Sequence, residues 1–344
     1  MVLCTLPNRR VFALAALAAL WSGPAPAGDA IPGVAEEIEL RLASPVLPSW
    51  APAGFRSDGQ WNALQRFYKE RAYAPAWIAD AGLDPRATEF VEALARLADH
   101  GLDPRQYAPS PAVPAAGTEA GHAWPTALAN RDLQISLSLL RVAQDVLEGR
   151  FSPRGASAYW PAAPAVEADG AELLRRAVEG EGPAALLSGL APAHAQYAAL
   201  LQALAEHRAI AAAGGWPPVP EMEPRRGRQD PRLPFLRARL AASGDLPAAA
   251  QTARPSAFDR ALQQALKRFQ ARHGLTADGK LGGATLAALN VPVEERIEQI
   301  ELNLERWRWL PRQLGERYVL VNVGAFELHA VENGRVAERM KIVA

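Results

Sequence analysis

The chain has 344 residues with 37 basic and 37 acidic side chains, so its formal net charge is zero. This length allows two or three domains of about 100–200 residues each, and the balanced charge, with no long block of Lys or Arg, argues against a nucleic-acid partner. Cys4 is the only cysteine, which excludes a disulfide within the chain and any zinc site built on several cysteines.

The first 27 residues have the pattern of a cleaved export signal. Arg9 and Arg10 precede an apolar, uncharged run over residues 11–21, and Ala25-Pro26-Ala27 places small residues where a signal peptidase cuts. The run is shorter than the ~20 apolar residues of a spanning helix. We therefore expect this segment to be removed, Cys4 with it, leaving a periplasmic protein without a stable membrane anchor. The paired arginines also resemble a twin-arginine signal, so both export routes remain open.

Residues 28–215 are expected to form a helical domain. A Gly-Leu-Asp-Pro tetrapeptide occurs at 82–85 and again at 101–104, and each copy combines a glycine that can end a helix with residues that can begin the next. Apolar residues at helical spacing predict helices over about 86–100, 130–148 and 193–213. An early group of aromatic residues can line a ligand groove or fill a core, and the second is the commoner use: Trp50, Phe55, Trp61, Phe67, Tyr68, Tyr73 and Trp77.

A proline-rich break follows, because no helix continues through the three prolines of residues 217–220. We expect residues 216–250 to be a linker with a short helix and residues 251–292 to be a small domain. Within it, residues 257–273 are amphipathic, with Phe258, Leu262, Leu266 and Phe269 on one face and Gly274 at the end. Asp278-Gly279 predicts a turn, and Thr285 lies in the first turns of the next short helix.

Residues 293–344 combine a helix with strands. Ile297, Ile300, Leu304 and Trp307 predict the helix. The period then changes, so that residues 318–323, 326–331 and 335–343 read as strands, with Asn333-Gly334 as a two-residue hairpin turn. A fragment of two or three strands is marginal in water. We therefore expect these strands to lie partly exposed, with unpaired backbone donors along the first of them.

Two motifs carry a resemblance to known families. The pattern Phe269-Gln270-x-x-His273-Gly274-Leu275-x-x-Asp278-Gly279-x-x-Gly282-x-x-Thr285 resembles the repeat of the small peptidoglycan-binding domain, with Gly283 where proline is common. The run Glu305-Arg306-Trp307-Arg308-Trp309-Leu310-Pro311 and the hairpin after it resemble the start of the catalytic domain of murein L,D-transpeptidases, with Gly324 at another frequent proline position.

The order of these parts is that of L,D-transpeptidases with a helical scaffold domain, so the resemblance covers nearly all of the mature chain. It implies a mainly α protein with a signal peptide (1–27), a helical scaffold domain (28–215), a linker (216–250), a small three-helix peptidoglycan-binding domain (251–292), and a connecting helix with the first β-hairpin of an incomplete β-rich catalytic domain (293–344). The partner that it implies is peptidoglycan, through glycan strands and stem peptides.

In that family a cysteine in a Ser-His-Gly-Cys segment attacks a stem-peptide carbonyl and forms an acyl-enzyme. No such segment occurs in these 344 residues, so no catalytic residue is carried over, and we expect the chain alone to be inactive. The sequence contains no Gly-x-Ser-x-Gly elbow that could replace the cysteine nucleophile and no His-x-x-x-His pair that could bind zinc. We therefore expect no cofactor and no metal ion. His100 and His273 each precede a helix-ending glycine, which favours a structural role.

The candidate peptidoglycan contacts are Phe269, Gln270, Asp278, Thr285 and Asn290. The four polar residues among them can equally serve as turn or cap residues. Two functions remain open, a truncated or split L,D-transpeptidase and a non-enzymatic periplasmic protein that docks on peptidoglycan. The hairpin favours the first, because a dedicated binding protein has little reason to keep an unpaired apolar edge strand.

Overall fold

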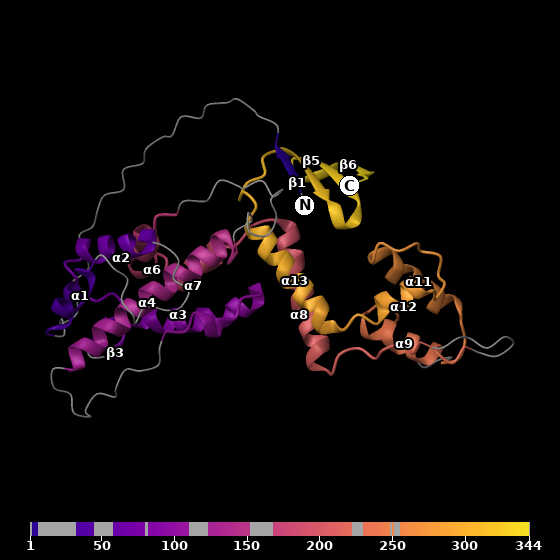
Figure 1. Cartoon of the computed structure of the whole chain (residues 1–344), viewed down its shortest axis with the longest axis horizontal. Coiled ribbons are helices and arrows are strands. Elements are labelled where there is room, and N and C mark those ends of the chain that lie inside the picture. The colour runs from indigo at the N-terminus through magenta and orange to yellow at the C-terminus, as the bar shows by residue number, and fades with distance from the viewer. Residues whose placement is uncertain are drawn as a thin grey trace. The chain divides into compact units, whose positions relative to one another are not determined.

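The computed structural model describes residues 2–5, 32–44, 58–79, 82–109, 123–151, 168–221, 230–247, 250 and 255–343. The predicted fold class is confirmed, because helices make up most of this part of the chain (Figure 1). The chain divides into two compact units. Unit 1 contains Met1–His194 and Glu305–Ala344, and unit 2 contains Ala195–Leu304. No helix among the described residues is long and apolar enough to cross a membrane.

Unit 1 is built around one long helix, α4 (Ala123–Glu148), which begins earlier than the helix predicted over residues 130–148. It packs against α1, α6 and α7, and apolar side chains are buried on all of its faces, which is typical of a central helix. The other helical elements are α1 (Val34–Leu42), α2 (Asp58–Glu70), α3 (Pro85–Ala95), η1 (Arg96–His100), η2 (Pro104–Gln106), α6 (Gly170–Glu179) and α7 (Pro183–Leu190).

The early aromatic residues are core residues where the structure describes them. Trp61, Phe67, Tyr68 and Trp77 are each at most 2% exposed and belong to one continuous apolar core. Tyr73 is partly buried against the same core, while Trp50 and Phe55 lie outside the described residues. The interpretation of this group as a packed core is thereby confirmed for its described members.

In both Gly-Leu-Asp-Pro copies the aspartate caps the next helical turn, but only the second glycine ends a helix. Asp84 and Asp103 each cap the following helical turn by accepting a bond from the backbone N–H two residues on. Gly101 ends η1 with a left-handed φ of 71°. The stop signal predicted at Gly82 is wrong, because this glycine lies in strand β3 (Gly82–Leu83), which pairs with β2 (Ile78–Ala79).

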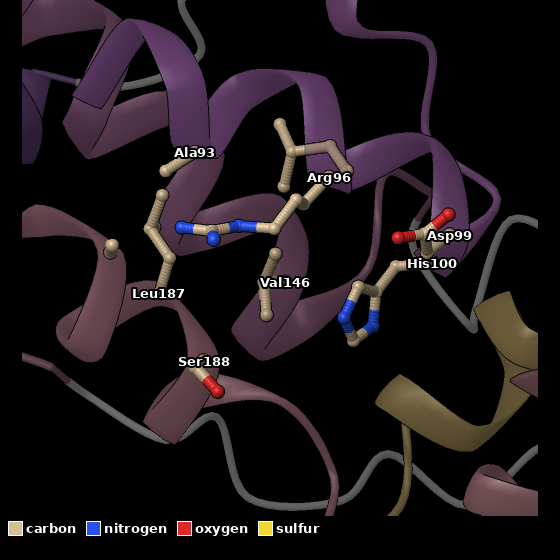
Figure 2. Close-up of a pocket in the computed structure, with 9 residues that line it drawn as sticks. Ala93, Arg96, Asp99, His100, Val146, Leu187 and Ser188 are labelled. Carbon is tan, nitrogen blue, oxygen red and sulfur yellow. The ribbon is translucent and has the colours of Figure 1, made fainter. Parts of the chain in front are cut away.

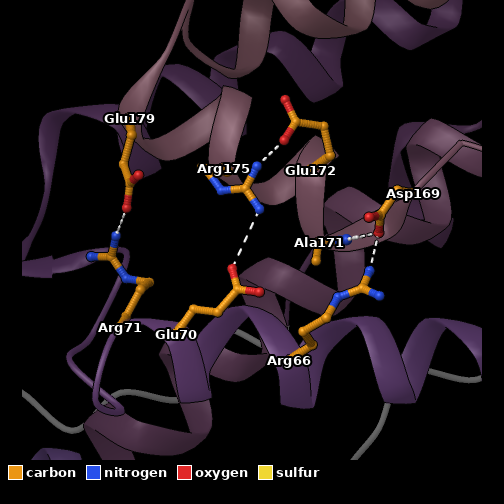
Figure 3. Close-up of polar contacts among 8 residues, drawn as sticks. All are labelled: Arg66, Glu70, Arg71, Asp169, Ala171, Glu172, Arg175 and Glu179. Carbon is orange, nitrogen blue, oxygen red and sulfur yellow. Dashed lines mark hydrogen bonds and ion pairs between the residues drawn. The ribbon is translucent and has the colours of Figure 1, made fainter. Parts of the chain in front are cut away.

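Charged side chains join α2 to α6 on the surface of unit 1 (Figure 3). Arg66 of α2 and Arg71, which follows α2, pair with carboxylates at Asp169 and Glu179. Glu70 lies 3.3 Å from the guanidinium of Arg175. Each such exposed pair contributes less than about 1 kcal/mol. These pairs therefore add little to the stability of unit 1.

Unit 2 contains α8 (Ala195–Ala212), α9 (Leu233–Ala242), α11 (Arg260–Arg272), α12 (Gly283–Leu289) and most of α13 (Val293–Arg308). Helices α9, α11 and α12 share one apolar core and form the predicted three-helix domain. Helix α9 lies in the segment that the sequence indicated as a linker, yet Leu233, Leu236 and Leu240 are buried in this core. Helix α8 ends at Ala212, and Gly214 and Gly215 just after it both have positive φ.

The strands β4 (Arg317–Asn322), β5 (Glu327–Glu332) and β6 (Arg335–Lys341) form an antiparallel sheet in unit 1. Asn333 and Gly334 both have positive φ, as the predicted two-residue turn requires. The expectation of an unpaired edge along the first strand is wrong, because β1 (Val2–Thr5) pairs with β4. Removal of an export signal would free that edge. Strand β6 is exposed along its whole length.

The charged residues of the run 305–312 satisfy backbone groups at helix ends of unit 1. Glu305 and Arg308 form a buried ion pair of 2.9 Å. Glu305 also accepts a bond from the N–H of Phe151, and Arg308 donates to the carbonyl of His100. Arg312 donates to the last carbonyls of α4, at Val146 and Leu147. This run therefore stabilises helix ends that are left without partners inside their own helices.

Gly149 gives a test of this arrangement, because it has a φ of 82° and a Cβ there would lie 2.6 Å from both Glu305 Oε1 and Trp309 Nε1. We expect Gly149→Ala to lower the free energy of unfolding of unit 1 by about 2–3 kcal/mol, from backbone strain and overlap. Urea denaturation measures this change. Gly189→Ala is the control, since nothing lies within 4 Å of its Cβ position. Equal denaturation midpoints for the two variants would contradict the packing around Gly149.

Candidate functional site: a groove in the three-helix domain

Gln270 is the polar centre of the three-helix domain. Its side chain lies on the inner face of α11 and is 1% exposed. Its Oε1 accepts a 2.8 Å bond from the N–H of Gly279, and its Nε2 lies within 3.1 Å of Asp278 Oδ1, the Lys280 carbonyl and Thr285 Oγ1. A buried amide that is bonded at both ends holds its partners firmly. Gln270 therefore fixes the loop between α11 and α12.

The Asp278-Gly279 turn of this loop has the conformation that the sequence indicated. Gly279 takes a left-handed φ of 73°, and a Cβ there would lie 2.9 Å from Cγ of Gln263. The carboxylate of Asp278 accepts a 2.8 Å bond from the N–H of Lys280. This bond and the amide of Gln270 lower the pKa of Asp278, so the exposed side chain is a carboxylate at neutral pH.

An open groove of about 610 Å³ lies beside this turn. Three segments line it, namely the start of α9, the chain just before α11 together with its first turn, and the loop ahead of α12. The lining residues are Asp230, Arg232, Leu233, Ser256, Ala257, Phe258, Gln263, Asp278, Gly279, Lys280 and Leu281. The groove thus lies within unit 2 and is formed by α9, the start of α11 and the loop ahead of α12.

Phe258 is the aromatic surface of the groove, and its placement corrects the sequence interpretation. Helix α11 begins at Arg260 with Asp259 as its N-cap, so Phe258 precedes the helix and is 46% exposed. The buried guanidinium of Arg237 donates to the carbonyl of Ala257 and to Asp259, each at 2.7 Å. Bonds on both sides of Phe258 thereby hold its backbone in place, with the ring accessible.

The groove also carries charge. The guanidinium of Arg232 is occupied, because it bonds to both oxygens of Asp230 at 2.8–3.2 Å. The ammonium of Lys280 makes no hydrogen bond or ion pair with any residue that the structure describes. The groove therefore offers an aromatic face, hydrogen-bonding groups and one available cation, which suits an elongated ligand with polar groups and a carboxylate.

Of the five candidate contacts from the sequence, Asp278 alone lines the groove. Phe269, Gln270 and Thr285 are buried, and Asn290 bonds through its amide to the N–H and carbonyl of Val219 at 2.8 and 2.9 Å. These four side chains hold the domain together, and a direct contact with peptidoglycan remains a prediction for all five. Sequence reasoning missed Phe258 as a groove residue, although Asp259 was the available N-cap signal.

A second buried arginine ties α9 to the rest of the domain. Arg239 lies 3.8 Å from the ring centre of Trp216 and 5.6 Å from that of Phe269, and it donates to the carbonyl of Leu289 at 2.7 Å. Burial lowers the pKa of Arg239 to about 10, so it remains charged at neutral pH. Among the described residues, no group of three His, Cys, Asp or Glu side chains is placed to hold a metal ion.

These features define a helical protein with a groove-bearing small domain, and two family models match the chain accordingly. Residues 62–204 match the scaffold domain family, and residues 229–289 match the peptidoglycan binding domain family. The second match contains α9, α11, α12 and every groove residue. No curated protein matches the chain. The chain therefore has a scaffold domain and a peptidoglycan-binding domain, an order of parts consistent with an L,D-transpeptidase-like architecture and a cell-wall-related role.

Proposed function

We propose that this chain is an exported periplasmic protein of cell-wall biogenesis that docks on peptidoglycan through the groove beside Phe258. Its scaffold and peptidoglycan-binding domains are consistent with the architecture of the L,D-transpeptidases, and these 344 residues alone act by binding and not by thiol chemistry. The groove, which lies wholly inside the matched peptidoglycan-binding region, carries this proposal. These 344 residues contain no cysteine other than Cys4, so they alone supply no thiol nucleophile once an export signal is removed.

The chemistry of the groove fits both components of peptidoglycan. A sugar ring presents an apolar face of C–H groups that packs against an aromatic ring such as Phe258. The carboxylate of Asp278 and the amide of Gln263 can bond to sugar hydroxyls and peptide N–H groups. The ammonium of Lys280 can pair with a stem-peptide carboxylate. An elongated glycopeptide uses all three kinds of contact at once.

Binding to purified insoluble peptidoglycan tests the proposal. We expect Phe258→Ala to weaken binding about tenfold, because an aromatic anchor at the centre of an interface contributes 1–2 kcal/mol or more. Phe235→Ala is a matched control, since Phe235 is 45% exposed on α9 of the same unit and does not line the groove. The muropeptide composition of the peptidoglycan should be unchanged after incubation, as expected for binding without turnover.

The proposal has two parts, the groove as the binding surface and binding without catalysis, and different results would contradict each part. Equal losses for Phe258→Ala and Phe235→Ala would show that the groove is not the binding surface. Full retention by both variants would show the same. New cross-links in the peptidoglycan after incubation with the unaltered chain would contradict the non-catalytic role.

A further inference from the structure

The groove of unit 2 carries two opposite charges that do not neutralise each other. Asp278 and Lys280 both line it, on either side of Gly279. They form no ion pair with each other, and neither side chain has an ion-pair partner among the residues that the structure describes. The other two charged groove residues, Asp230 and Arg232, bond to each other, so their charges largely cancel. The unpaired charges of the groove are therefore one carboxylate and one ammonium, two residues apart.

The carboxylate of Asp278 is oriented, although its side chain is exposed. Its Oδ1 accepts a 3.0 Å bond from Gln270 Nε2 and a 2.8 Å bond from the N–H of Lys280. Gln270 is 1% exposed and also bonds to Gly279 and Thr285, so it is a firm support. Within the described chain, Oδ2 of Asp278 makes no hydrogen bond. One oxygen thus holds the carboxylate in place, and the other is available to a ligand.

The hollow of unit 1 lacks such an arrangement (Figure 2). It has a volume of about 140 Å³, and exposed side chains of opposite charge, Arg96 and Asp99, line it. No hydrogen bond with another described residue orients either of these side chains. This hollow therefore selects no charged ligand, and the oriented carboxylate of Asp278 distinguishes the groove from it.

The two charges of the groove favour the stem peptides of peptidoglycan over its glycan strands. The glycan is built from N-acetylated sugars whose carboxyl groups are joined to the stems as amides, so the strand itself carries no charge. A stem peptide that contains diaminopimelate carries both signs. Until this residue is cross-linked, its side chain ends in a carbon that bears an ammonium and a carboxylate. A ligand with both groups on one carbon matches a turn that presents both countercharges.

We propose that the groove binds the free amino-acid end of an uncross-linked stem peptide, in which one carbon carries an ammonium and a carboxylate. The ammonium donates to Asp278 Oδ2 and the carboxylate pairs with Lys280, while Phe258 packs against the apolar part of the peptide. Cross-linking converts the ammonium into an uncharged amide, so the chain prefers uncross-linked stems. This inference rests on the proposed function, because it names the part of peptidoglycan that the same groove takes.

Titration of the purified chain with three soluble stem tripeptides tests the inference, with affinities measured by ligand-observed NMR. The first tripeptide contains diaminopimelate, the second contains diaminopimelate acetylated on its side-chain amine, and the third contains lysine, which has no side-chain carboxylate. We expect the acetylated and the lysine tripeptides each to bind about three- to fivefold more weakly than the first, because each loses one charge pair in a partly exposed groove.

Each charge of the groove has its own variant. Asp278→Asn keeps an oxygen that can accept from Gln270 and from the N–H of Lys280, so the turn is retained. It should no longer distinguish the diaminopimelate tripeptide from the acetylated one. Lys280→Met should no longer distinguish the diaminopimelate tripeptide from the lysine one. Lys267→Met is the control, because Lys267 approaches Gly279 from α11 but does not line the groove. It should bind all three tripeptides as the unaltered chain does.

Equal affinities of the unaltered chain for the three tripeptides would overturn the inference, as would no saturable binding or variants that weaken all three alike. Insoluble peptidoglycan separates this failure from failure of the proposed function. If Phe258→Ala still weakens binding to insoluble peptidoglycan while the tripeptides bind alike, only the inference fails. If Phe258→Ala binds insoluble peptidoglycan as the unaltered chain does, the proposed function fails and the inference fails with it. Thermal unfolding of each variant confirms that the samples compared are folded.

Discussion

Replacement of Asp132 by alanine should lower the free energy of unfolding of unit 1 by at least about 3 kcal/mol, because three buried donors lose their acceptor at about 1–3 kcal/mol each. The N–H groups of Ala76 and Trp77 donate to this carboxylate at 2.7–3.0 Å, and the hydroxyl of Tyr68 donates to it as well. Ser136 accepts a further bond from the Trp77 indole at 2.7 Å. Denaturation by urea, monitored by helix content, measures the loss.

Asp132→Asn is the matched variant, because an asparagine oxygen can accept from the two backbone N–H groups while its NH₂ donates to Tyr68. Burial raises the pKa of Asp132 in the folded chain above its unfolded value, although its hydrogen bonds oppose this. A raised folded pKa adds stability that is present below the unfolded pKa and is lost as pH rises through the folded pKa. The unaltered chain should therefore lose stability relative to Asp132→Asn as pH rises from about 4. A pH-independent difference between the two proteins would contradict this.

Replacement of Gln270 by alanine should weaken both the fold of unit 2 and its binding to peptidoglycan. The N–H of Gly279 loses its acceptor and the carbonyl of Lys280 loses its donor, which should cost about 2–4 kcal/mol in free energy of unfolding. The loop that carries Asp278 and Lys280 would then no longer be held beside Phe258. Urea denaturation measures the loss of stability. Binding of the folded variant to insoluble peptidoglycan measures the loss of affinity.

The control for Gln270→Ala is Gln264→Ala, which removes an exposed glutamine from the same helix. It should change neither stability nor binding. If Gln270→Ala weakened binding while leaving the denaturation midpoint unchanged, Gln270 would act on the ligand directly and not through the loop. That result would favour its sequence-predicted role as a contact over its role in positioning the loop.

Local signals predicted several elements of this fold, although α1, α2, α6 and α7 were not among them. Apolar spacing located α3, α8 and α11 to within a few residues, because a helix that buries one face must repeat apolar residues at its own period. The Asn333-Gly334 turn was found because few residues other than Asn and Gly tolerate positive φ at both positions. The pairing of β1 with β4 joins residues more than three hundred positions apart, and no local pattern encodes it.

The groove was harder to predict than the domain that carries it. The motif residues Phe269, Gln270 and Thr285 stand out in the sequence because they build the domain, and the same role places them in its interior. Phe258 was assigned to the buried face of α11 because its spacing from Leu262 fits a helix, although the helix begins after it. The burial of Arg237 and Arg239 depends on acceptors supplied by other segments, which no local pattern around these residues indicates.

The partnership of the run 305–312 with the helix ends of unit 1 has a consequence for the order of folding. Unit 2 is an insertion between two stretches of chain that belong to one compact body, since unit 1 resumes at Glu305. Bringing the ends of a long flexible insertion together costs closure entropy, which falls when the insertion has already folded into a compact domain. Arg312 follows the whole peptidoglycan-binding domain in the chain. The carbonyls of Val146 and Leu147 can therefore accept hydrogen bonds from Arg312 only after that domain has been synthesised.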